Sequence, residues 1–160
     1  MTQGITDGSL GKDFMTIIRL VLFFMVLALA SCDEELTDPP IPDADFQDIQ
    51  INLSLPEYNA LNTPRGHLEL GNGGIRGIIL YNYNGQYLAI EKYCSYQENA
   101  CGYVQVHTSN LYLTDNCCGS NFSLPEVNPT AGPARSPLRI YETFLSGSTL
   151  TITDQSSNGF

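Results

Sequence analysis

The sequence predicts an all-β domain of antiparallel hairpins, a sandwich or small barrel, from about Ile49 onward. Short runs rich in Ile, Tyr, Val, Leu and Thr alternate with turn residues, which is typical of strands. Outside the first 31 residues, no stretch keeps the periodicity of an amphipathic helix over three turns. Strands are expected at 49–55, 75–81, 87–91, 103–106, 111–113, 138–144 and 149–153.

Turn residues between these runs define the hairpins. Asn84-Gly85 separates the second and third runs. This dipeptide favours a type I′ turn, because both central residues of that turn need positive φ. Residues 108–110 and 146–148 link two further pairs of runs, and 60–64 forms one short helical turn at most. The domain is therefore expected to consist of local hairpins, without an internal repeat.

An export signal precedes the domain. Polar residues 1–14 are followed by one basic residue, Arg19, by an apolar run over 20–30, and by a small residue before Cys32. The run is shorter than the roughly 20 apolar residues of a membrane-spanning helix and ends in a small-residue cleavage site. LASC, residues 29–32, resembles the lipobox of bacterial lipoproteins, which implies cleavage before Cys32 and lipidation of its thiol. Met15 is the expected true start, since the signal would then begin at its usual place.

A strongly acidic segment separates the expected lipid from the domain. Residues 33–48 carry seven carboxylates, three prolines and no basic residue, which predicts an extended, solvated tether. We therefore expect a leader over 1–31, a lipidated tether over 32–48, a folded domain over 49–154 and a tail over 155–160. The formal net charge of −10 disfavours binding to nucleic acid or to an anionic membrane surface. The expected membrane contact is the lipid anchor at the outer membrane or cell surface, and inner-membrane retention through Asp33 stays open.

Four cysteines lie in the expected domain, in two loops. Cys94 and Cys101 bracket CSYQENAC after one expected strand, and Cys117 and Cys118 lie in DNCCGSNF after another. Because a hairpin joins the two loops, their tips should face each other. An even number of cysteines in an exported chain favours disulfides, but four cysteines allow three pairings.

The segment over about residues 74–154 resembles the Rieske [2Fe–2S] domain. The second box of that family, C-P-C-H-G-S-x-F, is similar to CGSNF at 118–122. Its proline loop is similar to GPA at 132–134, followed by Pro137-Leu138. The resemblance implies an antiparallel Rieske-like (ISP-type) sandwich of short hairpins, with two loops that carry the cysteines and a final hairpin over 138–153.

The resemblance also implies which residues would hold a cluster. A Rieske cluster binds one iron through two cysteines and the other through two histidines. In this chain those four positions hold Cys94, Tyr96, Asp115 and Cys118. Cys94 keeps its ligand and Cys118 exchanges a histidine for another iron ligand, but Tyr96 and Asp115 seldom hold such clusters. We therefore expect no bound cofactor, with a [2Fe–2S] cluster at these four residues as the alternative.

Disulfide bonds follow from the same resemblance. Electron-transfer members of the family have an inter-loop disulfide at positions that correspond to Cys101 and Cys117. The resemblance thus implies a Cys101–Cys117 bond. It leaves Cys94 and Cys118 facing each other, so that a second bond, Cys94–Cys118, is expected in an oxidising compartment. A metal held at the four cluster positions and an exchange-active or vicinal Cys117–Cys118 pair are the alternatives.

No catalytic set emerges from the sequence, which favours a protein that is not an enzyme. His67 and His107 occupy no ligand position and are expected at the surface or in turns. The expected function is that of a membrane-anchored, cluster-free Rieske-fold lipoprotein. It would act as a structural module or as a binding module for an unidentified protein or small molecule. The alternatives are an electron-transfer protein with unusual cluster ligands and a thiol–disulfide redox protein.

Overall fold

The computed structural model describes residues 15, 17–20, 39–96 and 102–156, and it divides into two compact units, Met1–Glu35 and Leu36–Phe160. In the first unit, the described residues are helical and exposed. No helix within the described residues is long and apolar enough to span a membrane. The expected cleavage site, the lipidation site at Cys32 and residues 157–160 of the tail lie outside the described residues.

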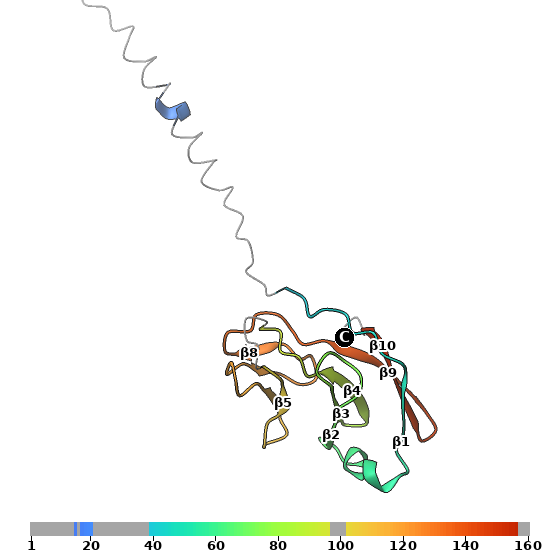
Figure 1. Cartoon of the computed structure of the whole chain (residues 1–160). Helices are drawn as coiled ribbons and strands as arrows, with labels where there is room; N and C mark the ends of the chain where they lie inside the picture. The colour runs from blue at the N-terminus through green and yellow to red at the C-terminus, as the bar shows by residue number, and fades with distance from the viewer. Residues whose placement is uncertain (1–14, 16, 21–38, 97–101, 157–160) are drawn as a thin grey trace, which may run out of the picture. The chain divides into compact units, whose positions relative to one another are not determined.

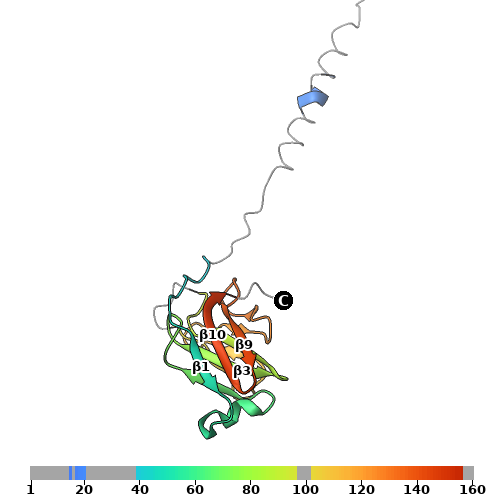
Figure 2. The same cartoon turned by 90° about the vertical axis from the view of Figure 1, so that its right-hand side faces the viewer.

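The second unit contains two antiparallel sheets (Figure 1). The larger sheet has six strands in the order β1-β10-β9-β4-β3-β2, and the smaller sheet has four in the order β5-β6-β7-β8. Figure 2 shows β1, β10 and β9 side by side, as their pairing requires. The prediction of an all-β antiparallel fold is confirmed. The strands are β1 Ile49–Asn52, β2 His67–Leu70, β3 Ile78–Tyr83, β4 Gln86–Glu91, β5 Gln105–Val106, β6 Leu113–Thr114, β7 Asn121–Phe122, β8 Pro129–Ala131, β9 Ile140–Ser146 and β10 Thr149–Ser156.

The hairpin between β3 and β4 forms as predicted. Asn84 and Gly85 have φ of 54° and 97°, so both central residues of the turn lie in the left-handed region. The Asn82 side chain accepts a hydrogen bond from the backbone amide of Gly85 at 2.6 Å. The β5–β6 hairpin also forms, with Gln105 opposite Thr114, and it connects the two cysteine loops.

Several elements differ from the sequence prediction. Strands β2, β7 and β8 were not predicted, because runs of two to four residues show too little alternation to be recognised. The segment Pro56–Asn62 forms a 3-10 helix, longer than the single turn expected at 60–64. The expected strand at 75–81 begins only at Ile78, since Gly73, Gly74 and Gly77 have positive φ and form a turn there.

Strand β3 of the larger sheet is buried on both faces, and its two faces belong to different cores. Ile79 and Tyr81 of β3 lie in a cluster that also contains Leu113 and Phe122 of the smaller sheet. Leu80, between them along the strand, lies in a second cluster with residues of β1 and β10. This alternation follows from the opposite directions of successive side chains in a strand. Cys94 belongs to the first cluster, so the first cysteine loop packs at the core between the sheets.

The domain begins earlier than the expected boundary at Ile49. Residues 39–48 have no regular secondary structure, but Ile41 is buried and the Phe46 ring contacts Tyr141 edge-on at 5.0 Å. The Arg139 guanidinium donates a hydrogen bond to the Ile41 carbonyl at 2.8 Å and pairs with Asp43. The second half of the expected tether therefore packs against the domain and is not solvated throughout.

Candidate functional site

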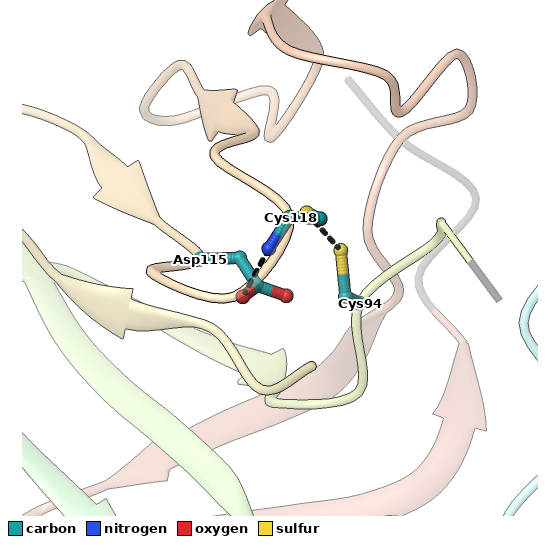
Figure 3. Close-up of side chains that lie close together, drawn as sticks. All are labelled: Cys94, Asp115 and Cys118. Carbon is teal, nitrogen blue, oxygen red and sulfur yellow. Dashed lines mark hydrogen bonds between the residues drawn. The ribbon is translucent and has the colours of Figure 1, made fainter. Parts of the chain in front are cut away.

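The two cysteine loops meet at the edge of the core between the sheets (Figure 3). The first loop leaves β4 through Tyr93, which bridges to Tyr103 in an isolated antiparallel pair. The second loop leaves β6 at Asp115 and closes into a tight turn. In that turn the amide of Asp115 donates to the Ser120 carbonyl at 2.9 Å, and the amide of Gly119 donates to the Asp115 carbonyl at 2.8 Å.

Cys94 and Cys118 face each other across this junction. Their Sγ atoms lie 3.7 Å apart, and both residues are free cysteines. Cys94 is buried, with 2% of its surface exposed, whereas Cys118 is half-buried. The prediction that the loops face each other is confirmed for this pair. The expected Cys94–Cys118 disulfide is not formed in the structure, because an S–S bond would require the sulfurs to approach to about 2.05 Å.

Asp115 is the third side chain at the junction. It is fully buried, and its Oδ1 atom accepts hydrogen bonds from the amides of Cys117 at 2.7 Å and Cys118 at 3.3 Å. Its Oδ2 atom is buried and has no hydrogen-bond partner. In Figure 3 the carboxylate oxygen that is not bonded to the Cys118 amide points toward Cys94. A candidate ligand atom of Cys94, Asp115 and Cys118 each lies within 4.8 Å of the other two.

The environment of the two sulfurs is not uniformly apolar. Ser120 places its hydroxyl 3.1 Å and its amide nitrogen 3.4 Å from the Cys118 sulfur. Burial raises the pKa of the Cys94 thiol, and so do the Asp115 carboxylate and the Cys118 thiol, while a hydrogen bond from the Tyr96 amide lowers it. Without a metal ion or an oxidant, Cys94 is therefore a protonated thiol at neutral pH.

A third loop supports both cysteine loops. Gly132 packs so closely on the second loop that a Cβ atom there would lie 2.5 Å from the Ser120 Cα. The Ala134 amide donates to the Ser120 hydroxyl oxygen at 3.1 Å. The Ser95 hydroxyl of the first loop donates to the Ser136 carbonyl at 2.6 Å. The segment that resembles the Rieske proline loop thus contacts the described part of each cysteine loop.

Glu91 fixes the start of the first cysteine loop. Its fully buried carboxylate accepts hydrogen bonds from the backbone amides of Ile75, Arg76 and Tyr93 and from the Tyr141 hydroxyl, at 2.7 to 3.1 Å. Four donors compensate for the burial of one charge. The sequence prediction missed this network, because its donors come mainly from backbone atoms that have no sequence signature.

The remaining predicted site residues lie as follows. Cys117 is disulfide-bonded, and its expected partner Cys101 lies outside the described residues, as do 97–100. Tyr96 is half-buried and packs against the core cluster of the junction. His107 lies in a turn as expected, with Nδ1 2.9 Å from the Ser109 hydroxyl. His67 lies in strand β2, not in a turn, and stacks on Tyr81.

The residues at the junction fit a Rieske cluster poorly. Such a cluster needs four ligand groups, two of them histidines. The described residues bring together two cysteines and one aspartate, and neither described histidine belongs to this group.

A pocket of about 250 Å³ borders the second cysteine loop and is lined by Tyr103, Gln105, Asp115, Asn116 and Cys117. The sequence offered no indication of this pocket.

Two solved structures are similar to the chain. The ferredoxin of carbazole 1,9a-dioxygenase from Nocardioides aromaticivorans IC177 is 19% identical, with 57% of this chain and 86% of the ferredoxin covered and a TM-score of 0.44. A complex of reduced oxygenase and oxidized ferredoxin in carbazole 1,9a-dioxygenase is 15% identical, with 59% and 86% covered and a TM-score of 0.46. No protein-family model and no curated protein matches the chain.

Proposed function

We propose that this protein is an exported, lipid-anchored Rieske-fold domain that holds no [2Fe–2S] cluster. It works as a binding or structural module at the cell envelope and not as an enzyme. One observation carries the proposal. At positions where the resemblance places cluster ligands, two cysteine sulfurs lie 3.7 Å apart beside a buried aspartate, and no histidine of the described residues belongs to this group.

The distance between the sulfurs supports the absence of a cluster. Sulfur atoms at 3.7 Å are close to contact, so two iron atoms and two sulfides do not fit between the loops in this arrangement. The ligand chemistry supports it as well, because Tyr96 and Asp115 stand where the family has a histidine and a cysteine. A cluster would need the loops to separate and a tyrosine to bind iron.

The lipid anchor is supported by the sequence alone. Cleavage before Cys32 would leave a lipidated N-terminus, followed by the acidic residues 33–38 and then by the segment that packs on the domain from Ile41. The packed segment shortens the free tether. We therefore propose that the domain stays close to the membrane that holds the lipid, at the outer membrane or cell surface.

In an oxidising envelope, Cys94 and Cys118 would form the second inter-loop disulfide. Thiol–disulfide exchange with an oxidised partner protein would transfer two electrons and two protons from the pair to that partner. The bond requires an approach from 3.7 Å to about 2.05 Å, within reach of small loop movements. Together with a Cys101–Cys117 bond, it would stabilise the loops by about 2–4 kcal/mol per bond.

A second candidate function is thiol–disulfide exchange itself. The half-buried Cys118 lies beside the buried Cys94, an arrangement in which one sulfur is accessible to a partner and the other completes the bond. A reduction potential of the pair in the range of thiol–disulfide oxidoreductases would favour this candidate, whereas a much lower potential would favour a structural bond.

The test of the main proposal is the iron and acid-labile sulfide content of the full-length protein, purified in detergent without oxygen. We expect a colourless protein with neither iron nor sulfide above background. Equal amounts of iron and sulfide, together with a coloured centre that is lost in Cys94→Ser, would show that a cluster is bound and that the proposal is wrong.

A further inference from the structure

We propose that the reduced Cys94–Cys118 pair and the Asp115 carboxylate bind one thiophilic divalent metal ion of the Zn²⁺ class. This inference rests on the proposed absence of a [2Fe–2S] cluster, since both would occupy the same side chains. It assigns a ligand of different chemistry to the junction, a single ion with a mixed sulfur and oxygen shell.

The spacing of the two sulfurs suits a single ion. Zn–S bonds are about 2.3 Å long, so two thiolates on a tetrahedral Zn²⁺ lie roughly 3.8 Å apart. The Sγ atoms of Cys94 and Cys118 lie 3.7 Å apart. No change in the distance between the loops is therefore needed for both sulfurs to bind one ion, whereas a disulfide requires them to approach.

The Asp115 carboxylate supplies the independent evidence. Its Oδ1 atom is fixed by the amides of Cys117 and Cys118, which holds the carboxylate in one orientation. Its Oδ2 atom is buried, in a residue with no exposed surface, and makes no hydrogen bond of ordinary geometry; a neighbouring group is the Cys94 thiol, which is only a weak donor. A buried carboxylate oxygen without a partner is unfavourable. A metal ion between the oxygen and the two sulfurs would provide the missing partner.

The groups around the sulfurs suit thiolate ligands. The Ser120 amide donates a hydrogen bond to the Cys118 sulfur at 3.4 Å. The Cys118 thiol donates to the Ser120 hydroxyl oxygen at 3.1 Å, and the hydroxyl could donate in the opposite direction once the thiol is replaced by a thiolate. Ser120 is itself held by the Ala134 amide, which donates to its hydroxyl oxygen at 3.1 Å. Such outer contacts orient metal ligands and tune the ion that they bind. The proline loop would thus stabilise the metal site through its hydrogen bond to Ser120.

Three protein ligands leave one position of a tetrahedral ion open. Structural zinc sites usually have four protein ligands, whereas sites with three protein ligands keep a position for water or another ligand. Cys118 is half-buried, so the ion would be reached from the Cys118 side of the junction. We assign the fourth position to water.

The test uses the full-length protein, reduced with a phosphine and kept without oxygen, and Co²⁺ as a spectroscopic probe. We expect one Co²⁺ per chain, with thiolate-to-cobalt charge-transfer absorption and the intense visible bands of a tetrahedral site, and displacement by Zn²⁺. Absence of the charge-transfer absorption in the wild-type protein would overturn the proposal, whatever the variants do.

Matched variants separate the site from adventitious binding. Asp115→Asn keeps Oδ1 as an acceptor for the loop amides and should weaken Co²⁺ binding at least tenfold, whereas Asp48→Asn, at an exposed position, should not. Cys118→Ser should abolish the charge-transfer absorption. Cys117→Ser should keep it, because the disulfide of Cys117 is already open under these conditions. Equal binding by Asp115→Asn, Cys118→Ser and wild type would overturn the proposal.

Failure of the proposed metal site and failure of the proposed function give different experimental results. Iron and sulfide in the purified protein would overturn the proposed function and this inference together. A cluster-free protein that binds no Co²⁺ through thiolates would overturn this inference alone and leave the disulfide-forming pair.

Discussion

Gly132 of the proline loop leaves no room for a side chain, so adding a methyl group there should lower the stability of the domain. Its φ is +87°, and a Cβ atom would lie 2.5 Å from the Ser120 Cα and 2.7 Å from two further backbone atoms. These are backbone atoms of the second cysteine loop, and moving them would disturb the hydrogen bonds of its turn. We expect Gly132→Ala to lower the free energy of unfolding by about 2–4 kcal/mol, measured by urea denaturation.

Gly147→Ala is the matched control for Gly132→Ala. Gly147 also has a positive φ, of +59°, but a Cβ atom there would meet nothing within 4 Å. The control therefore measures only the cost of a left-handed alanine, about 1 kcal/mol. Equal destabilisation by the two variants would show that the contact between Gly132 and Ser120 does not stabilise the junction.

At the residue scale, the motif predicted the partners at the site but not their chemistry. CGSNF placed Ser120 in the second cysteine loop and GPA placed Gly132 in the proline loop, and in the structure these two residues are in contact. The contact between Cys94 and Cys118 was predicted as a disulfide, and it is a pair of thiols in the structure. The unpartnered Oδ2 atom of Asp115 could not be predicted, because hydrogen bonding depends on which backbone amides the turn directs toward the carboxylate.

The hydrogen bonds to the Glu91 carboxylate connect β4, β9 and the glycine turn that precedes β3. Loss of one of these bonds should therefore lower the stability of the packing between these elements. Tyr141→Phe removes one of the donors to the Glu91 carboxylate. We expect a loss of about 1–2 kcal/mol in the free energy of unfolding at pH 7, with the native fold retained. Tyr103→Phe, at an exposed position, is the control and should change stability by less than about 0.5 kcal/mol.

The same network predicts a pH dependence at alkaline pH. Burial, and next the neighbouring Glu91, raise the pKa of Tyr141 above its ordinary value of 10.0. The unfolded chain therefore loses this proton at lower pH than the folded one, and stability falls as the pH rises above about 10. Chemical denaturation between pH 8 and pH 11 should show a shallower loss in Tyr141→Phe than in wild type. A loss of the same steepness in both would contradict the raised pKa of Tyr141.

The segment over 39–48 behaves as an element of the domain although it has no regular secondary structure. Phe46 is half-buried against Tyr141, whereas Phe144 has 57% of its surface exposed. We expect Phe46→Ala to cost about 1–2 kcal/mol in urea denaturation, and Phe144→Ala to cost less than about 0.5 kcal/mol. A neutral Phe46→Ala would mean that the segment is a free tether, as its composition alone suggests.

At the element scale, local signals determined what could be predicted. Asn84-Gly85 predicted its hairpin because the turn depends on two residues. Strands β7 and β8 were missed because each has only two or three residues, too few for a recognisable alternation. The packing of residues 39–48 was missed because the ion-pair partner of Asp43 is Arg139, directly before β9, and a local sequence pattern does not reveal a partner so distant in the chain.

At the scale of the whole molecule, a two-sheet domain brings a pair of thiols and a buried carboxylate together, at three of the positions where the resemblance to the Rieske domain implies cluster ligands. Both cysteine loops and the proline loop remain in place, held by Ser95, Ser120 and Gly132. If the proposed lipid anchor holds this junction at the envelope, we expect its state to follow the local supply of oxidants and metal ions.

Native mass spectrometry of the full-length protein, purified in detergent without oxygen, tests the central claim most directly. We predict a chain without iron or sulfide, whose mass beyond that of the lipidated polypeptide is either zero or that of one metal ion. An added mass of two irons and two sulfides, retained in the native spectrum and lost on denaturation, would contradict it and would restore the electron-transfer function that the Rieske resemblance implies.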